Sequence, residues 1–307
     1  MPREFEKIER FVAVFSAPPS PEGPGDDACV LRPQRTKLCM TTDALVEGVH
    51  FSRKHFSLAQ VGHKALAVNL SDMAAMGAVP DFWMCALGLP PRFCGRSLEA
   101  LAGGMLPLAQ RYGLRLVGGN ITASPVLSLT LTLGGWASKP LLRCGAKPKD
   151  KLYVVGSLGE AAAGLWAMQQ ALRVPRRFLE AQRRPSPWVE AALLAAPHVH
   201  AAIDVSDGLL QDLGHLCAAS GLGARLEASA LPIPAELRRR FPERALSCAL
   251  RGGEDYALLL AIPPAKARRV EREFTARAWP LSCVGSFIHS QGIWLDGRRV
   301  SPWGHQH

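Results

Sequence analysis

The sequence contains no apolar run long enough to cross a bilayer. Its first six residues, Met-Pro-Arg-Glu-Phe-Glu, carry no apolar segment typical of a signal peptide. We therefore expect a cytoplasmic protein with no membrane partner. The eight cysteines are scattered singly, with no C-x-x-C pair and no Cys/His spacing that suits zinc. We expect most of them to be small core residues in a reducing compartment.

Several common catalytic motifs are also absent. The sequence has no G-x-x-x-x-G-K-[ST] phosphate loop, no G-x-S-x-G nucleophile elbow, and no H-R-D or D-F-G set of a protein kinase. Aromatic residues make up only 7% of the chain and are not interleaved with the basic clusters, which argues against a nucleic-acid partner. We interpret the formal charge of +10 as an arginine-rich solvated surface.

The 307 residues alternate between segments typical of strands and of helices, which favours an α/β or α+β fold. A shift to basic chain containing proline and glycine around residues 140–150 marks the predicted domain boundary. One domain is expected at 1–140 and the other at 141–307. Within the second, the basic and proline-rich segment 173–187 is expected to be a loop.

The apolar run from Leu58 to Gly77 is the most informative single segment. It predicts a buried helix with Ser57 as its N-cap and Gly77 as its stop. Asn69 and Asp72 lie three residues apart on this run and therefore share a face. A buried carboxylate needs a cation or hydrogen bonds. Asp72 is thus either a metal ligand or an aspartate satisfied by a neighbouring backbone group or arginine.

Other acidic residues recur beside glycine turns and at the ends of apolar strands. Each alone has an ordinary explanation as a turn or cap residue. Strand ends in α/β proteins converge on ligand crevices, however, and converging carboxylates need hard cations such as Mg²⁺ or Mn²⁺. The set comprises Asp26, Asp27, Asp43, Asp204, Asp207, Glu254 and Asp255, with hydroxyls at Thr41, Thr42 and Ser206.

Two of these features depend on where strands end. A strand over residues 37–42 is expected to end at Asp43. A strand over 114–117 is expected to lead into a tight turn at Gly118-Gly119-Asn120. Such a turn either brings backbone N–H groups close to a phosphate or is only a turn.

Taken in order, these segments resemble the thiamine-monophosphate kinases of the aminoimidazole-ribonucleotide-synthetase-like superfamily. The resemblance spans about residues 23–300, and the segments 47–51 and 69–77 together distinguish this branch from its relatives. The motifs that carry it are Gly25-Asp26-Asp27, Thr41-Thr42-Asp43, Glu47-Gly48-Val49-His50-Phe51, Asn69 to Gly77, Gly118-Gly119-Asn120, Arg143-x-Gly145-Ala146-Lys147, Asp204-Val205-Ser206-Asp207-Gly208 and Gly252-Gly253-Glu254-Asp255-Tyr256.

The resemblance implies ATP-dependent phosphorylation of thiamine monophosphate to thiamine diphosphate, with several Mg²⁺ ions and no assigned general acid or base. It also implies a two-domain synthetase-like fold. The N-terminal domain would bind ATP and Mg²⁺ and would pair its sheet with a second subunit into a barrel, making a homodimer. The C-terminal domain would be α/β.

The resemblance also implies the residue roles, by motif position. The Mg²⁺ ligands would be Asp27, Thr42, Asp43, Asp72, Asp204 and Asp207. The ATP contacts would be Gly119, Asn120, Arg143 and Ser206. The thiamine monophosphate contacts would be His50 and Glu254, with Trp303 as an aromatic candidate.

The sequence departs from the family at three points. Asn120 stands where many members have Asp, and Ala102 stands about where some members have an aromatic residue near the adenine. Trp303 lies in an ending that differs from the usual Gly-aromatic-x-His-Phe. Two alternatives therefore stay open. One is a sister ATP-using enzyme, namely aminoimidazole ribonucleotide synthetase, selenophosphate synthetase or a hydrogenase maturation factor. The last two are disfavoured because the expected cysteines near the two ends are missing. The other is a nucleotide-binding regulatory protein without turnover.

Overall fold

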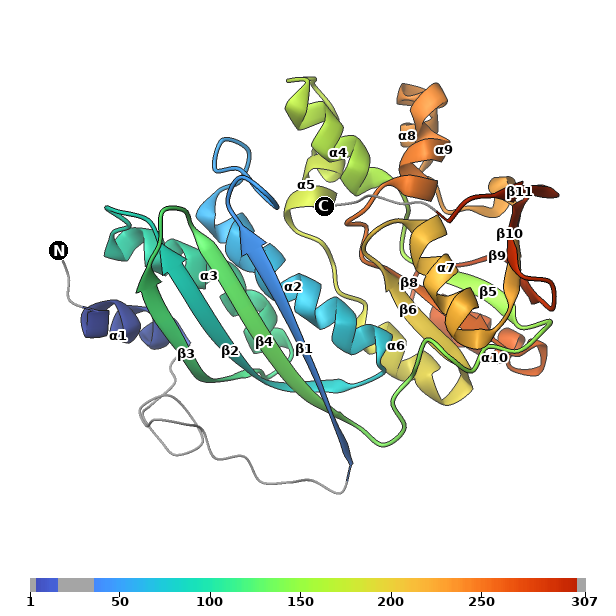
Figure 1. The fold of residues 1–307 in the computed structure, drawn as a ribbon, viewed down its shortest axis with the longest axis horizontal. Helices are drawn as coiled ribbons and strands as arrows, with labels where there is room; N and C mark the ends of the chain where they lie inside the picture. The colour runs from blue at the N-terminus through green and yellow to red at the C-terminus, as the bar shows by residue number, and fades with distance from the viewer. Residues whose placement is uncertain (1–3, 16–35, 303–307) are drawn as a thin grey trace. The chain divides into compact units, whose positions relative to one another are not determined.

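The computed structural model describes residues 4–15 and 36–302 (Figure 1). The described chain forms two compact units. The first holds the residues up to Met73 together with Ala78–Lys139, and the second holds Ala74–Gly77 together with the chain from Pro140 onward. Within these ranges, no helix is long and apolar enough to cross a membrane. Both units combine helices with a sheet, which confirms the predicted fold class.

The first unit is a four-stranded sheet covered by helices. Its sheet has the order β1-β4-β2-β3, in which β4 pairs antiparallel with β1 and β2, and β2 and β3 run parallel. Helices α2 and α3 lie on one side of this sheet, with α1 beside α3 (Figure 1). The bounds are α1 Glu4–Val14, β1 Lys37–Val46, α2 Leu58–Ala75, β2 Val79–Leu89, α3 Gly95–Arg111, β3 Arg115–Ala123 and β4 Ser128–Ala137.

Local signals set both ends of α2, as predicted. The Ser57 hydroxyl accepts from the Gln60 N–H at 3.3 Å, and the Gln60 side chain accepts from the Ser57 N–H at 2.9 Å, which is a reciprocal capping box. At the other end Gly77 has a φ of +58°, a left-handed conformation that glycine adopts at little cost. The Ala78 N–H then closes the end by donating to the Met73 carbonyl at 3.0 Å.

Helices α2 and α3 approach each other closely through two glycines. A Cβ on Gly62 would lie 2.0 Å from the Leu101 carbonyl oxygen, and a Cβ on Gly104 would lie 1.9 Å from the Ala59 carbonyl oxygen. No side chain fits at either distance, so glycine allows the two backbones to touch. This contact fixes α2, the helix that carries Asn69 and Asp72, against α3.

Two sequence-based expectations about strand ends are wrong. Strand β1 continues to Val46, so Asp43 lies inside the strand rather than at its end. Gly118-Gly119-Asn120 is not a turn but part of β3, because it pairs in parallel with Met84, Cys85 and Ala86. A Cβ on Gly119 would lie 2.2 Å from the Cys85 carbonyl oxygen, so this glycine serves close strand approach.

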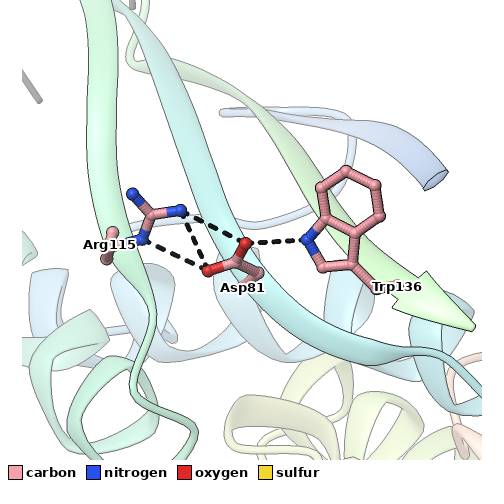
Figure 2. A network of polar contacts seen from close by, with 3 residues as sticks. All are labelled: Asp81, Arg115 and Trp136. Carbon is pink, nitrogen blue, oxygen red and sulfur yellow. Dashed lines mark hydrogen bonds and ion pairs between the residues drawn. The ribbon is translucent and has the colours of Figure 1, made fainter. Parts of the chain in front are cut away.

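Asp81 ties three strands together at one end of this sheet (Figure 2). It has no partner in the β2–β4 register, which shifts between Pro80 and Phe82. Its carboxylate accepts from the Arg115 guanidinium of β3 at 3.1 to 3.2 Å and from the Trp136 indole N–H of β4 at 2.8 Å. Bidentate, charge-assisted bonds of this kind are directional, so the network fixes the local positions of the strands.

The second unit is built on a seven-stranded mixed sheet. Its strand order is β11-β10-β7-β9-β5-β8-β6, with β7 and β10 parallel and the other neighbouring pairs antiparallel. The strands are β5 Lys151–Val155, β6 Ala201–Val205, β7 Gly223–Leu226, β8 Ala257–Ile262, β9 Leu281–Ile288, β10 Gly292–Leu295 and β11 Arg298–Val300. The helices are α4 Glu160–Gln169, α5 Arg176–Arg183, α6 Val189–Ala195, α7 Leu209–Ser220, α8 Ala235–Arg240, α9 Pro242–Arg251 and α10 Pro264–Thr275.

The expected loop at 173–187 is wrong in its central part, because α5 forms there. Phe178 and Gln182 lie one turn apart on α5 and are both buried, whereas the arginines at 176 and 177 are exposed. The high arginine content suggested a solvated loop, but arginine is a good helix former. The buried face formed by Phe178 and Gln182 is sufficient to pack α5 against α4.

Candidate active site

Asp43 and Asp72 come together in the first unit, from β1 and α2. Their carboxyl groups lie within hydrogen-bonding reach of each other. The Thr41 hydroxyl of β1 also donates to the Asp72 carboxylate. Burial, and next the negative charge of Asp72, raise the pKa of Asp43 to about 6. Two carboxylates this close repel each other once both are ionised, which is the situation that a divalent cation relieves.

Asn69 adds a further oxygen one turn before Asp72. Its side chain is fully buried, and its Nδ2 donates to the Ala65 carbonyl at 3.0 Å. Its Oδ1 has no hydrogen-bond partner in the part of the chain that the structure describes. The three-residue spacing to Asp72 predicted the shared face, but Asn69 was not among the predicted ligands. A buried amide oxygen near carboxylates suits a hard cation.

Thr42 lies apart from this group, because successive residues of a strand point to opposite faces. Its hydroxyl donates to the Leu131 carbonyl at 3.0 Å and accepts from the Thr132 hydroxyl at 3.2 Å. The structure thus brings the hydroxyl of Thr41, rather than that of Thr42, to Asp72.

His50 is built into the turn that follows β1. Its ring Nδ1 accepts from the backbone N–H of Val46 at 3.1 Å, and the backbone N–H of His50 donates to the Val46 carbonyl at 2.9 Å. Gly48, at φ +87°, reverses the chain inside this turn. Because Nδ1 accepts a hydrogen bond, the neutral ring carries its proton on Nε2.

Gly119 and Asn120 lie on β3, at the opposite edge of the sheet from β1. Three strand spacings separate these edges, which corresponds to roughly 14 Å along the sheet. The structure therefore does not bring Asn120 into direct contact with Asp43. The side chain of Asn120 is exposed.

In the second unit, Asp204, Ser206 and Asp207 sit at the end of β6 and in the turn before α7. Asp204 is buried opposite Leu258 of β8. Gly208, at φ +117°, connects the turn to α7. A Cβ on Gly208 would lie 3.0 Å from the Arg251 carbonyl carbon.

Asp212 is a residue that the sequence reasoning missed. Its carboxylate accepts from the N–H groups of Asp207 at 3.0 Å and Gly208 at 3.1 Å, which fixes the turn. Gln211 donates to the Asp207 carboxylate at 2.8 Å. Burial raises the pKa of Asp212 to about 7, although the backbone N–H donors oppose this shift. The sequence signal that could have found it is an acidic residue in the first turn of the helix that follows Ser206-Asp207-Gly208.

The segment from Gly252 to Tyr256 packs beside this turn through its backbone. The Glu254 N–H donates to the Ser206 carbonyl at 2.7 Å, and the Tyr256 N–H donates to the Val205 carbonyl at 2.8 Å. Glu254 and Tyr256 both have positive φ angles, of +69° and +48°. Non-glycine residues adopt such angles rarely, and they cluster at functional sites.

Asp255, between these two residues, caps helix α4. Its carboxylate accepts from the Gly159 N–H at 2.6 Å and the Ala161 N–H at 3.2 Å. Burial raises the pKa of Asp255 to about 7, against the lowering effect of these two bonds. We therefore assign Asp255 to structure, and its neighbour Glu254 remains the candidate for ligand contact.

Arg143 is exposed in a segment that is anchored by its backbone. The Ser220 hydroxyl donates to the Arg143 carbonyl at 3.0 Å and accepts from the Ala146 N–H at 3.3 Å. Asp150 accepts from the Lys147 N–H at 2.8 Å and pairs with the His200 ring at 2.8 Å. Both anchors hold the loop that presents the Arg143 side chain.

Two predicted site residues, Asp27 and Trp303, lie outside the described residues. Among the residues that are described, no group of three or more His, Cys, Asp or Glu side chains forms a preassembled metal site. The acidic pairs described above are therefore incomplete as metal cages, although Mg²⁺ commonly completes its shell with water and substrate phosphates.

Comparison with known proteins identifies the family. The N-terminal domain of AIR synthase related proteins matches residues 25–137, and their C-terminal domain matches residues 147–294. The thiamine-monophosphate kinase of Salmonella typhimurium is 39% identical over 299 residues, which cover 93% of this chain and 91% of that protein.

Solved structures agree with this assignment. The thiamine-monophosphate kinase of Stenotrophomonas maltophilia K279a has a TM-score of 0.86 at 35% identity, covering 96% of both chains. AaThiL complexed with AMPPCP and TMP has a TM-score of 0.82 at 29% identity, covering 99% of this chain and 96% of that one. The chain belongs to the AIR synthase related proteins and, within them, to the thiamine-monophosphate kinase family.

Proposed function

We propose that the chain transfers the γ-phosphoryl group of ATP directly and in line to the phosphate of thiamine monophosphate, giving thiamine diphosphate and ADP in a reducing cytoplasm. The observation that carries this proposal is the half-buried Asp43–Asp72 pair in a chain that matches thiamine-monophosphate kinases over nearly its full length. The AMPPCP and TMP bound to AaThiL support ATP and thiamine monophosphate as the two ligands.

Mg²⁺ is the ion that the residues of the first unit suit. The carboxylates of Asp43 and Asp72 and the orphaned Oδ1 of Asn69 are hard oxygen donors. Bound Mg²⁺ would supply neutralisation of the phosphate charges during transfer. By motif position, we propose Asp27 as a further ligand, whereas the hydroxyl of Thr42 points to the other face of β1 and is engaged by Leu131 and Thr132. We propose Asp204 and Asp207 as Mg²⁺ ligands of the second unit, and Gly119, Asn120, Arg143 and Ser206 as ATP contacts.

The reaction needs no strong general base. The accepting phosphate has a second pKa of about 6 and is largely ionised at neutral pH. The principal difficulty is to hold two polyanions in line, which positioning and positive charge can overcome. His50 fits a substrate contact better than a base, because its Nδ1 is already engaged with the Val46 N–H.

We further propose that two copies of the chain associate through the first unit. Four residues on the sheet face away from α2 form an apolar stripe: Leu38, Met40, Val79 and Trp136. Leu38, Met40 and Val79 are 45%, 55% and 54% exposed, which is unusual for large apolar side chains gathered in one place. A second copy of the same sheet would bury them.

The deciding experiment is a coupled assay of ADP release with thiamine monophosphate at varied Mg²⁺. We expect ADP release that requires both thiamine monophosphate and Mg²⁺. ADP release that ignores thiamine monophosphate would instead indicate a sister activity such as that of aminoimidazole ribonucleotide synthetase. Binding of ATP without any turnover would indicate the regulatory alternative, for which Asn120 is the motivating departure.

A further inference from the structure

A buried glutamine of the second unit holds the carboxylate of Glu254, the residue that the family resemblance assigns to contact with thiamine monophosphate. Gln182 on α5 is only 1% exposed, and its Nε2 donates to the Glu254 carboxylate. Only the NH₂ end of a carboxamide can serve a carboxylate, so this bond determines which way the amide points. The two residues are 72 positions apart in the sequence.

The carbonyl oxygen of the same Gln182 amide makes no stabilising hydrogen bond within the described chain. The Oε1 of Gln182 is buried and has no hydrogen-bond partner among the described residues. A buried carbonyl without a donor destabilises a fold, and each such group calls for an explanation. Fold stability therefore does not explain a glutamine at this position, whereas orientation of Glu254 does.

Helix α5 gives Gln182 a rigid base. Phe178, one turn earlier, is fully buried, and a Cβ on Gly164 of α4 would lie 2.0 Å from the Phe178 carbonyl oxygen. Arg177 adds ion pairs, with its Nε 2.9 Å from Glu160 and 3.5 Å from Glu236. These contacts fix α5 against α4 and α8, and Gln182 projects from that fixed surface.

Glu254 is held from its backbone side as well. Its N–H donates to the Ser206 carbonyl at 2.7 Å, and its strained φ of +69° is maintained by the Asp255 cap on α4. Strain of this kind persists only where the surroundings over-determine it. The backbone and the carboxylate are therefore both restrained.

The restrained carboxylate lies on the wall of a small pocket in the second unit. Its volume is about 180 Å³, and its lining includes Glu254, Trp166, Gln169, Gly252 and Gly253. Sites for whole drug-sized ligands usually begin at roughly 300 Å³, so this pocket suits one ring of a ligand. An aromatic wall beside a carboxylate favours a cationic heteroaromatic ring.

We propose that Gln182 is a positioning residue for substrate recognition, which orients Glu254 toward the cationic thiamine part of thiamine monophosphate and has no role in ATP binding. This inference rests on the proposed function, because thiamine monophosphate is taken as the substrate. It assigns selectivity to a residue outside the motifs that define the family.

The test compares Gln182→Met with Gln170→Met. Both variants introduce the same thioether side chain into the second unit, but Gln170 is exposed at the end of α4 and does not line the pocket, which makes it the matched control. For Gln182→Met we expect the KM for thiamine monophosphate to rise about tenfold, equivalent to about 1.4 kcal/mol. The KM for ATP and the melting temperature should stay at the wild-type values, as should all constants of Gln170→Met.

A double-variant cycle separates positioning from a merely structural role. If Gln182 acts through Glu254, then Gln182→Met should add almost nothing to the loss caused by Glu254→Gln. Additive losses, equal shifts in the KM values of both substrates, or a KM for thiamine monophosphate equal to that of Gln170→Met would overturn the inference. If Gln182→Met fails to fold, the conservative Gln182→Asn takes its place in the cycle.

Failure of the proposed function has a different signature. In that case the wild-type protein shows no ADP release that depends on thiamine monophosphate. The role of Gln182 is then decided by calorimetric binding of thiamine monophosphate without ATP. Weaker binding by Gln182→Met than by Gln170→Met supports it, and equal or absent binding contradicts it.

Discussion

The Thr41 hydroxyl on β1 donates a hydrogen bond to the Asp72 carboxylate on α2. This bond joins a sheet residue to a helix residue 31 positions later, at the place where Asp43 also approaches Asp72. It orients one carboxylate of the pair, and hydrogen bonds to a carboxylate favour its ionised form. The ionised form is the one that binds a metal.

Asp72→Asn should abolish turnover while the protein stays folded. The amide keeps the shape of the side chain and removes its repulsion of Asp43, but it also removes a charge that Mg²⁺ requires. We expect a loss of about 10²-fold or more in kcat, as for the removal of a preorganised electrostatic group. A coupled ADP assay and a thermal melt measure the two quantities. Nearly normal activity with a strongly lowered melting temperature would show that Asp72 is structural instead.

The hydroxyl of Thr41 can be tested by a matched pair of substitutions. Thr41→Val removes the donor at nearly constant volume, and Thr41→Ser retains it. A hydrogen bond to a charged group contributes about 1.5 to 3 kcal/mol. Thr41→Val should therefore weaken activity roughly tenfold or more at limiting Mg²⁺, whereas Thr41→Ser should remain close to wild type. Equal losses in both variants would argue against the hydrogen bond as the cause.

Gly104→Ala should destabilise the first unit, and its neighbour Gly103→Ala should not. A Cβ on Gly104 would overlap the Ala59 carbonyl oxygen at 1.9 Å, so α2 and α3 must separate. Overpacking of this kind costs about 1 to 3 kcal/mol or more. A Cβ on exposed Gly103 meets nothing within 4 Å, and alanine there should stabilise the helix by up to about 1 kcal/mol. Denaturant unfolding of both variants measures the contrast, and equal effects would contradict the predicted helix contact.

The raised pKa of Asp255 predicts a specific dependence of stability on pH. Because its folded pKa of about 7 exceeds its ordinary value of 3.8, the folded state binds the proton more tightly. Its contribution to stability is fully present below about pH 4 and is lost as the pH rises to about 7, with a slope of up to about 1.4 kcal/mol per pH unit. Asp255→Asn cannot titrate. The free energy of unfolding of the wild type minus that of Asp255→Asn should therefore fall across this range, and a constant difference would refute the assignment.

The apolar stripe predicts a dimer that a charge should disrupt. We expect a wild-type particle of twice the 33.1 kDa chain mass in light scattering. Met40→Glu places a carboxylate on the stripe and should shift the protein toward the monomer. Leu172→Glu, which changes an exposed leucine of the second unit, is the control and should leave the mass unchanged. A monomeric wild type, or equal behaviour of both variants, would exclude association through this face.

Much of the fold could be predicted because the signals are local. The serine cap and glycine stop of α2, the apolar runs of β5, β6 and β8, and the alternating run of β4 depend on residues only a few positions apart. The predictions were wrong where contacts with residues distant in the sequence determine the secondary structure. Gly118-Gly119-Asn120 looks like a turn by composition, and the pairing with β2 makes it a strand. Residues 176–183 look like a solvated loop, and packing against α4 makes them a helix.

The sequence by itself determined the family and its ordered motifs, because motif spacing along the chain is a one-dimensional property. Only the tertiary structure decided which motif residues meet. It placed the Thr41 hydroxyl at Asp72 and turned that of Thr42 to the other face, it assigned Asp255 to a helix cap, and it brought Gln182 to Glu254. These contacts join residues 31 to 96 positions apart, and such separations carry no periodic signal in the chain. They arise only when buried faces pack and polar groups must find partners inside the folded protein.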